Sequence, residues 1–178
     1  MALKLVKLFI PLILTSLLIS CHNDKVLLGC CSNPAIDENV GNGHIYVPNI
    51  FTPNADGIND NFTVFGDFNI LIIREMKIKN QNGELVFKAT DINPNVPSEG
   101  WDGTSFGLRF QGIFSFSIKV ETSDGTVKTL EGNVCNYPCG EADNLQVGHP
   151  NDCQFPSQVF SGLYDPTLPS FENFDCFE

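Results

Sequence analysis

Oxygen-bearing side chains alternate with small or apolar residues in one short stretch of the 178-residue chain. Asn54, Asp56 and Asp60 offer side-chain oxygens, Ile58 offers its carbonyl, and Gly57 permits a sharp turn between them. Oxygen ligands at alternate positions around a glycine are typical of calcium-binding loops. The pattern predicts that any metal held here is calcium. The alternative is that the same side chains cap the backbone N–H groups of a tight turn.

Cysteines are the second group with chemical potential. Six of the seven remain for disulfides if Cys21 is modified in another way: Cys30, Cys31, Cys135, Cys139, Cys153 and Cys176. An even number of cysteines in an exported chain is typical of a disulfide framework. A zinc site built from three of these cysteines and His149 is the competing interpretation. Its spacing matches no common zinc motif, and exported thiols tend to oxidise, so disulfides are favoured.

The adjacent Cys30 and Cys31 restrict the pairing. Neighbouring cysteines do not bond to each other without strain, so each needs its own partner. Cys135 and Cys139 both lie just after the last expected strand. We therefore expect these two cysteines to bond with Cys30 and Cys31, and Cys153 to bond with the remaining cysteine near the C-terminus.

The N-terminal segment predicts where the chain is delivered. Lys4 and Lys7 precede the apolar residues 8–19, and Cys21 follows two residues later. A basic start and a short apolar run are typical of a signal peptide, because the run is too short to span a bilayer. The ending is similar to the lipobox of bacterial lipoproteins, in which the cysteine is acylated. We expect residues 1–20 to be a lipoprotein signal peptide and Cys21 to carry the lipid anchor; the alternative is a secreted protein whose Cys21 joins a disulfide.

Charge and histidine content restrict the function further. The formal net charge is −11, and no Lys or Arg follows Lys128. This negative charge excludes nucleic acid as a partner. The acidic tail is expected to be a solvated surface, with cation or partner binding as the alternative. His22, His44 and His149 lie far apart, no Ser or Cys has the surroundings of a nucleophile, and we therefore expect no enzymatic activity.

Strand signals dominate the middle of the chain. Phe114, Phe116, Ile118 and Val120 alternate with polar residues, which places four apolar side chains on one face of a strand. Such a face requires a hydrophobic core to cover it. Trp101, which lies near two glycines, is predicted to pack into that core rather than bind a ligand.

Turn signals pair the strands. Asn82 and Gly83 separate two apolar segments, and Asp124 and Gly125 separate two more, so two hairpins are expected. A further strand is expected at residues 70–73. The economical arrangement is an all-β fold, a small antiparallel sandwich of immunoglobulin-like type.

Composition divides the mature chain into three parts. Residues 21–43 are polar and glycine-containing and are predicted to be a tether. Residues 44–134 form the predicted sandwich. Residues 135–178 are an acidic extension rich in Cys, Phe and Pro, expected to be irregular and disulfide-rich. Its aromatic side chains either pack against the sandwich, which we favour, or stay exposed to bind a partner.

Residues 46–60 read Tyr-Val-Pro-Asn-Ile-Phe-Thr-Pro-Asn-Ala-Asp-Gly-Ile-Asn-Asp. This stretch resembles the opening of the gliding-motility-associated C-terminal domain, the type B sorting domain of the type IX secretion system, whose members look like YVPNxFTPNGDGxND. Similar pieces follow at residues 76–80, 83–87, 100–104 and 111–118. The resemblance covers roughly residues 44–134 and implies a β-sandwich that serves delivery and display.

The chain departs from that family pattern in three ways. Ala55 stands where the family usually has Gly, and Gln81 and Asn82 replace the usual Arg-Trp. The family normally closes with a short final strand near Val134, whereas this chain continues. A sorting signal read from its C-terminal end would be masked by such an extension.

These expectations combine into one functional hypothesis and one alternative. The hypothesis is an exported outer-membrane lipoprotein that displays the sandwich as a structural or adhesion-type binding module, linked to gliding motility or cell-surface organisation. The lipid on Cys21 attaches it to the membrane, at the cell surface or on the periplasmic face. The alternative is a secreted cargo whose sandwich is a type IX sorting signal. Expected partners are the secretion machinery or cell-surface proteins, and calcium is the one cofactor considered.

Overall fold

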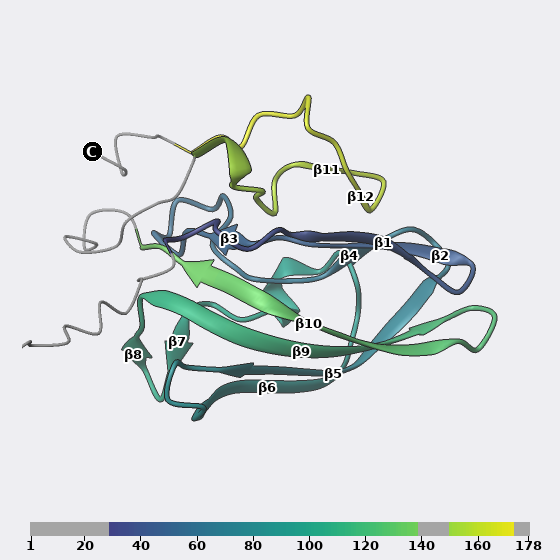
Figure 1. Cartoon of the computed structure of the whole chain (residues 1–178), viewed down its shortest axis with the longest axis horizontal. Helices are drawn as coiled ribbons and strands as arrows, with labels where there is room; N and C mark the ends of the chain where they lie inside the picture. Colours follow the sequence, from purple (N-terminus) through teal and green to yellow (C-terminus); the bar gives the residue numbers. More distant parts are fainter. Residues whose placement is uncertain (1–28, 139–149, 173–178) are drawn as a thin grey trace, which may run out of the picture.

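A computed structural model describes residues 29–138 and 150–172 of the chain (Figure 1). Within these residues the regular structure is β-strand apart from two short 3₁₀ helices. The elements are β1 (Ile36–Val40), β2 (Gly43–Val47), β3 (Ile50–Phe51), β4 (Phe65–Gly66), β5 (Ile70–Lys79), β6 (Leu85–Ile92), η1 (Pro97–Glu99), β7 (Thr104–Ser105), β8 (Leu108–Arg109), β9 (Gly112–Thr122), β10 (Val127–Asn136), η2 (Pro150–Asp152), β11 (Val159–Phe160) and β12 (Leu163–Tyr164). The predicted all-β class is confirmed.

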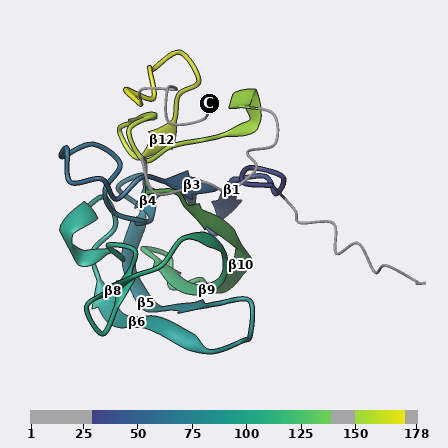
Figure 2. The ribbon, with the colours of Figure 1, turned by 90° about the vertical axis from the view of Figure 1, so that its left-hand side faces the viewer.

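Two sheets form the body of the molecule. The larger has the strand order β3-β10-β9-β5-β6 and the smaller has the order β1-β2-β4. The sheets lie face to face as two layers, and Figure 2 shows them end on. The pairs within them are antiparallel except β3 and β10, which run parallel at one edge. This is the predicted antiparallel sandwich with one parallel pair that the prediction did not include.

The core forms where the alternation of β9 predicted it. Phe114, Phe116, Ile118 and Val120 are all buried and belong to one hydrophobic cluster with apolar side chains of both sheets. Trp101 is fully buried in the same cluster, and its ring lies edge-on to Phe114 with the centroids 4.8 Å apart. Trp101 is therefore part of the core, as predicted.

Both predicted hairpins are present. Gly83 and Gly125 occupy the β5–β6 and β9–β10 turns with φ of +81° and +83°, a conformation that favours glycine. In the second turn Asp124 accepts hydrogen bonds from the Thr122 hydroxyl and the Thr126 N–H, and these bonds lower the pKa of its carboxyl to about 2. The strand expected at residues 70–73 is the start of the long β5.

The tether prediction is wrong for its last residues. β1 lies inside the predicted tether and pairs with β2 along its whole length. Lys128 of β10 binds the carboxylate of Glu38 over 2.8 Å, which ties β1 to the larger sheet. Asp37 and Asn39 project from this edge strand as exposed side chains, so the segment looked unstructured although its backbone completes a sheet.

Residues 150–172 form a third layer over the outer face of the smaller sheet (Figure 1). β11 and β12 make a short hairpin there, and Tyr164 at its end stacks on Tyr46 of β2. The side chain of Tyr46 is fully buried as a result. The favoured expectation that the aromatic side chains of the extension pack on the sandwich is confirmed for Phe155 and Tyr164, whereas Phe160 and Phe171 are exposed, as the alternative had it. No helix in the described part of the chain has the length and apolar character that crossing a bilayer requires.

Candidate functional site

Two disulfides join three separate parts of the chain at one pole of the sandwich. Cys30 bonds to Cys135 at the end of β10, and Cys31 bonds to Cys153 of the extension, with Cα–Cα distances of 5.3 and 4.9 Å. Phe155 packs with these cysteines in a second hydrophobic cluster. The prediction that Cys30 and Cys31 have different partners is confirmed. We call this region the disulfide pole.

The predicted pairing of Cys153 with Cys176 is wrong, because Cys153 bonds to Cys31. The residues after η2 run beside Asn49, which directly precedes β3, and this brings Cys153 to Cys31. Cys139 and Cys176 lie outside the described residues. The zinc alternative is not supported, since Cys135 and Cys153 belong to different disulfides and no cluster of three or more His, Cys, Asp or Glu side chains occurs in the described residues.

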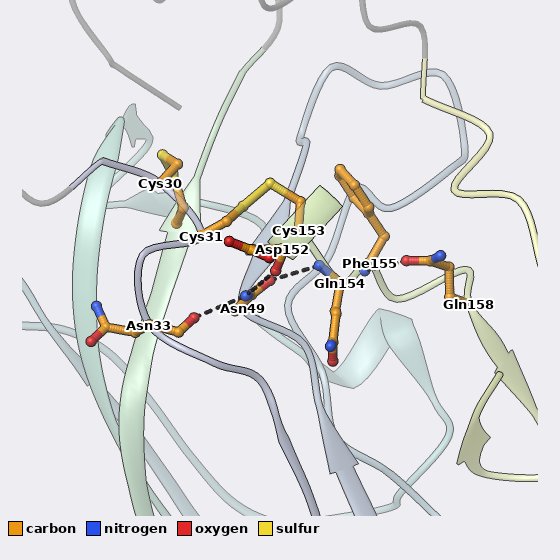
Figure 3. The surroundings of a disulfide bond; sticks show 10 residues. Cys30, Cys31, Asn33, Asn49, Asp152, Cys153, Gln154, Phe155 and Gln158 are labelled. Carbon is orange, nitrogen blue, oxygen red and sulfur yellow. Dashed lines mark hydrogen bonds between the residues drawn. A yellow bond between two sulfur atoms is a disulfide. The ribbon is translucent and has the colours of Figure 1, made fainter. Parts of the chain in front are cut away.

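Asn49 holds the disulfide pole together through all its polar groups. Its side-chain N–H groups donate to the carbonyl oxygens of Asn33 and Asp152, both over 2.9 Å, and its side-chain oxygen accepts the Gln154 N–H over 2.8 Å (Figure 3). Its backbone N–H donates to the Gln154 carbonyl, and its own carbonyl accepts the Cys135 N–H. A buried amide with every donor and acceptor satisfied fixes its neighbours in one arrangement.

Asn59 makes a second junction with the extension. Its amide donates to the Ser170 carbonyl over 2.9 Å and to the Glu172 carboxyl over 2.7 Å, and its side-chain oxygen accepts the Ser157 N–H over 2.7 Å. Thr52 also donates its hydroxyl to the Glu172 carboxyl. The two residues that flank the loop 53–58 therefore hold the extension.

Glu172 is buried at this junction, with 8% of its surface exposed. Burial raises the pKa of its carboxyl, and the negative charges of Asp56 and Asp60 raise it further, against the opposing effect of the hydrogen bonds from Thr52 and Asn59. A carboxyl with a raised pKa is easier to keep buried when it is protonated. Ionisation of this carboxyl is therefore expected to weaken the junction.

The predicted calcium ligands lie together in the loop but are turned toward its backbone. Asp60 accepts the N–H groups of Ala55 and Gly57 over 2.7 and 2.8 Å, and Asp56 accepts the N–H of Ile58 over 2.8 Å. Asn54 likewise accepts the Asp56 N–H. This is the geometry of the turn-capping alternative. Calcium binding stays a prediction for experiment.

Sequence reasoning missed Asn49, Asn59 and Glu172 as structural contacts. One signal for Asn49 was present: it is a polar residue inside the apolar run 45–51, and a polar side chain there needs buried hydrogen-bond partners. No comparable signal marked Glu172, because its partners lie more than a hundred positions away in the chain. The predicted lipidation residue Cys21 lies outside the described residues.

The fold and the site together define a disulfide-stapled, all-β module in which the residues on either side of the loop 53–58 hold the extension. A family model, described as the CHU_C type IX secretion signal domain, matches residues 45–133, which is half of the chain. The chain belongs to this family, and the resemblance found in the sequence is confirmed. No curated protein and no solved structure matches the chain.

The matched region coincides with the sandwich. It runs from β2 into β10 and leaves out β1, most of the disulfide pole and the extension. Membership in a secretion signal family indicates a role in secretion and a destination outside the cell or at its surface.

Proposed function

We propose that this protein is an exported, lipid-anchored surface protein that keeps its secretion signal domain as a display and binding module and is not an enzyme. Family membership supports the export. The observation that carries the rest is that Asn49 and the two disulfides bind the sandwich to the segment before it and to the extension after it.

Cys21 and Cys30 are close in the sequence, which limits how far the sandwich can lie from a lipid on Cys21. Eight residues lie between the two cysteines. At full extension this segment reaches about 30 Å. An acyl group on Cys21 would therefore hold the disulfide pole close to the lipid surface, with the opposite end of the sandwich pointing away from it.

A second candidate function is that of a secreted cargo whose sandwich acts as a working sorting signal. The family match itself favours it. In that case the extension would have to leave the recognised surface accessible, and Cys21 would have no anchoring role. The two candidates differ in the fate of a protein that lacks the Cys21 thiol.

The deciding experiment compares Cys21→Ser with Asn23→Ser in the native host, followed by separation of membranes, periplasm and medium. We expect Asn23→Ser to stay with the membranes and Cys21→Ser to accumulate in the periplasm. Retention of Cys21→Ser in membranes would contradict the anchor. Efficient appearance of Cys21→Ser in the medium, dependent on the type IX machinery, would establish the secreted-cargo function instead.

A protease added to intact cells tests the display. A surface location predicts that the native protein is cut without lysis. Protection of the native protein until the outer membrane is opened would place it on the periplasmic face and contradict surface display.

A further inference from the structure

Two open hollows lie end to end where the extension meets the sandwich. Their volumes are about 510 and 580 Å³, and both are lined by Phe65 of β4 and Pro156 of the extension. Because they share these two residues, the hollows are neighbours, and we call the two together the groove. One wall belongs to the family domain and the other to the extension, so neither part makes the groove alone.

The walls of this groove are apolar and largely preformed. Pro94 and Pro97 line it on the sandwich side, and Phe171 lines it on the extension side with 63% of its surface exposed. Phe68 stands at the other end with 90% exposed. Proline and aromatic walls of this kind suit an extended chain, whose side chains insert between the rings.

The charged residues that line the groove are all acidic. Asp60 and Asp67 are part of the lining, and neither hollow is lined by Lys, Arg or His. Close to the groove, burial and then the negative charges of Asp56 and Asp60 raise the pKa of the Glu172 carboxyl. A cationic side chain in the groove would therefore be attracted, and an anionic one repelled.

We propose that this groove binds an extended, apolar segment of a partner protein that carries Lys or Arg. The apolar side chains of that segment contact Pro97 and Phe171, and its cationic groups face Asp60 and Asp67. The family match ends at residue 133, before the extension begins, so this binding site is not part of the secretion signal domain alone. The proposal does not depend on the route by which the protein is exported.

The extension is fixed well enough to form a wall. The disulfide between Cys153 and Cys31 fixes the described part of the extension near its start. At its hairpin, Gly162 approaches Gly66 so closely that a Cβ atom would come within 1.8 Å of the Gly66 carbonyl oxygen. The groove is therefore held at both ends before any partner arrives, which reduces the ordering cost of binding.

The test uses the full mature chain and two short fluorescein-labelled synthetic peptides. One peptide contains only Leu, Pro and Lys, and the other has Glu in place of every Lys. We expect saturable binding of the Lys peptide, measured by fluorescence anisotropy, and no binding of the Glu peptide. Equal binding of both peptides, or no saturable binding of the Lys peptide at about millimolar concentration, would overturn the proposal.

Two variants with matched controls locate the binding. Phe171→Asn is compared with Phe106→Asn, because both phenylalanines are exposed, both have positive φ, and Phe106 lies outside the groove. Asn tolerates that backbone conformation. We expect Phe171→Asn to weaken binding of the Lys peptide about tenfold, as loss of one aromatic contact does, and Phe106→Asn to leave it unchanged. Equal effects of the two variants would overturn the assignment of the site.

The charge is tested in the same way. Asp67→Asn removes a carboxylate from the groove, and Asp102→Asn removes one from a turn elsewhere; each carboxylate accepts the N–H two residues later. We expect only Asp67→Asn to weaken binding and to reduce its dependence on salt. Circular dichroism verifies that each variant is folded. Identical salt dependence for wild type and Asp67→Asn would show that this carboxylate does not face the bound cation.

Discussion

Tyr164 stacks on Tyr46, with the ring centroids 5.1 Å apart and the ring planes inclined by 24°. The Tyr46 hydroxyl donates a hydrogen bond to the Phe155 carbonyl oxygen over 3.1 Å. Burial, followed by the nearby Tyr164 and Asp37, raises the pKa of Tyr46 far above its usual value, so the hydroxyl remains a donor. One side chain of the smaller sheet thus contacts two separate parts of the extension.

The close approach of Gly162 to Gly66 predicts a large effect from a single methyl group. In Gly162→Ala the added Cβ would meet the backbone of Gly66, which cannot move aside as a side chain does. We expect a loss of about 2 kcal/mol in the free energy of unfolding, typical of overpacking. Urea denaturation measures it.

Gly57→Ala is the matched control. Gly57 has φ of +89°, similar to the +81° of Gly162, but an added Cβ there meets nothing within 4 Å. Gly57→Ala should lower the free energy of unfolding only by the backbone strain of alanine at positive φ, about 1 kcal/mol. Equal losses in the two variants would mean that the hairpin of the extension is not held against β4.

The buried Glu172 predicts a dependence of stability on pH. The pKa of the Glu172 carboxyl in the folded protein is raised above its usual value of 4.5. The stability that this carboxyl contributes when protonated is therefore complete below pH 4.5 and is lost as the pH rises through the pKa of the folded protein. We expect Glu172→Gln, which keeps the acceptor oxygen, to be more stable than wild type at neutral pH and to approach wild type near pH 4. Thermal midpoints across this pH range measure the difference.

Glu99→Gln should have the opposite effect on stability: it should be less stable than wild type at neutral pH and approach wild type at low pH. Glu99 accepts the backbone N–H and the side-chain amide of Asn93, and these bonds lower the pKa of its carboxyl. The stability that the ionised Glu99 carboxylate contributes is present above its pKa in the unfolded chain. It disappears as the pH falls through the lower pKa of this carboxyl in the folded protein. The same sign of effect in Glu172→Gln and Glu99→Gln would contradict the buried state of Glu172.

The disulfide pole predicts both a connectivity and an energy. Peptide mapping without reductant should recover Cys30 with Cys135 and Cys31 with Cys153. A fragment that links Cys30 or Cys31 to Cys139 would refute the arrangement described here.

Removing the second disulfide in the double variant Cys31→Ser, Cys153→Ser should cost less than its sequence separation of 122 suggests. With Cys30 and Cys135 still joined, the loop that reopens has on the order of 20 residues, which corresponds to about 3 kcal/mol. Denaturant titration of the double variant measures the loss. A loss near zero would mean that the bond does not constrain the unfolded chain.

The loop around Asp60 separates turn capping from calcium binding. Asp60→Ala removes the acceptor for two backbone N–H groups, and we expect a loss of about 1 kcal/mol, as for loss of a helix cap. The capping geometry predicts the same thermal midpoint in calcium and in chelator. A midpoint that rises with calcium, and no longer does so in Asp56→Ala, would establish the calcium site instead.

The main strands were predictable because their signals are local. The alternation around Phe116 and the Asn-Gly and Asp-Gly turns act over a few residues, and β9 and both hairpins formed where expected. β1 was missed because an edge strand is held by its backbone, and only Val40 of its five residues is fully buried.

The contacts of the extension were not predictable in the same way. The choice between Cys139 and Cys153 as the partner of Cys31 depends on where η2 lies in space, and adjacent sequence does not encode that position. Asn49 and Asn59 were placed in the family motif, yet their partners come from a segment that lies outside the matched region.

Cys30 and Cys31 are joined by a single peptide bond, and one holds the end of β10 while the other holds the extension. Two covalent paths therefore connect Cys135 with Cys153. One is the backbone between them, and the other passes through both disulfides and the peptide bond between Cys30 and Cys31. Cleavage of the backbone anywhere between those two cysteines leaves both pieces on one molecule. After a cut between these two cysteines, release of the extension therefore also requires reduction of one of the two disulfides.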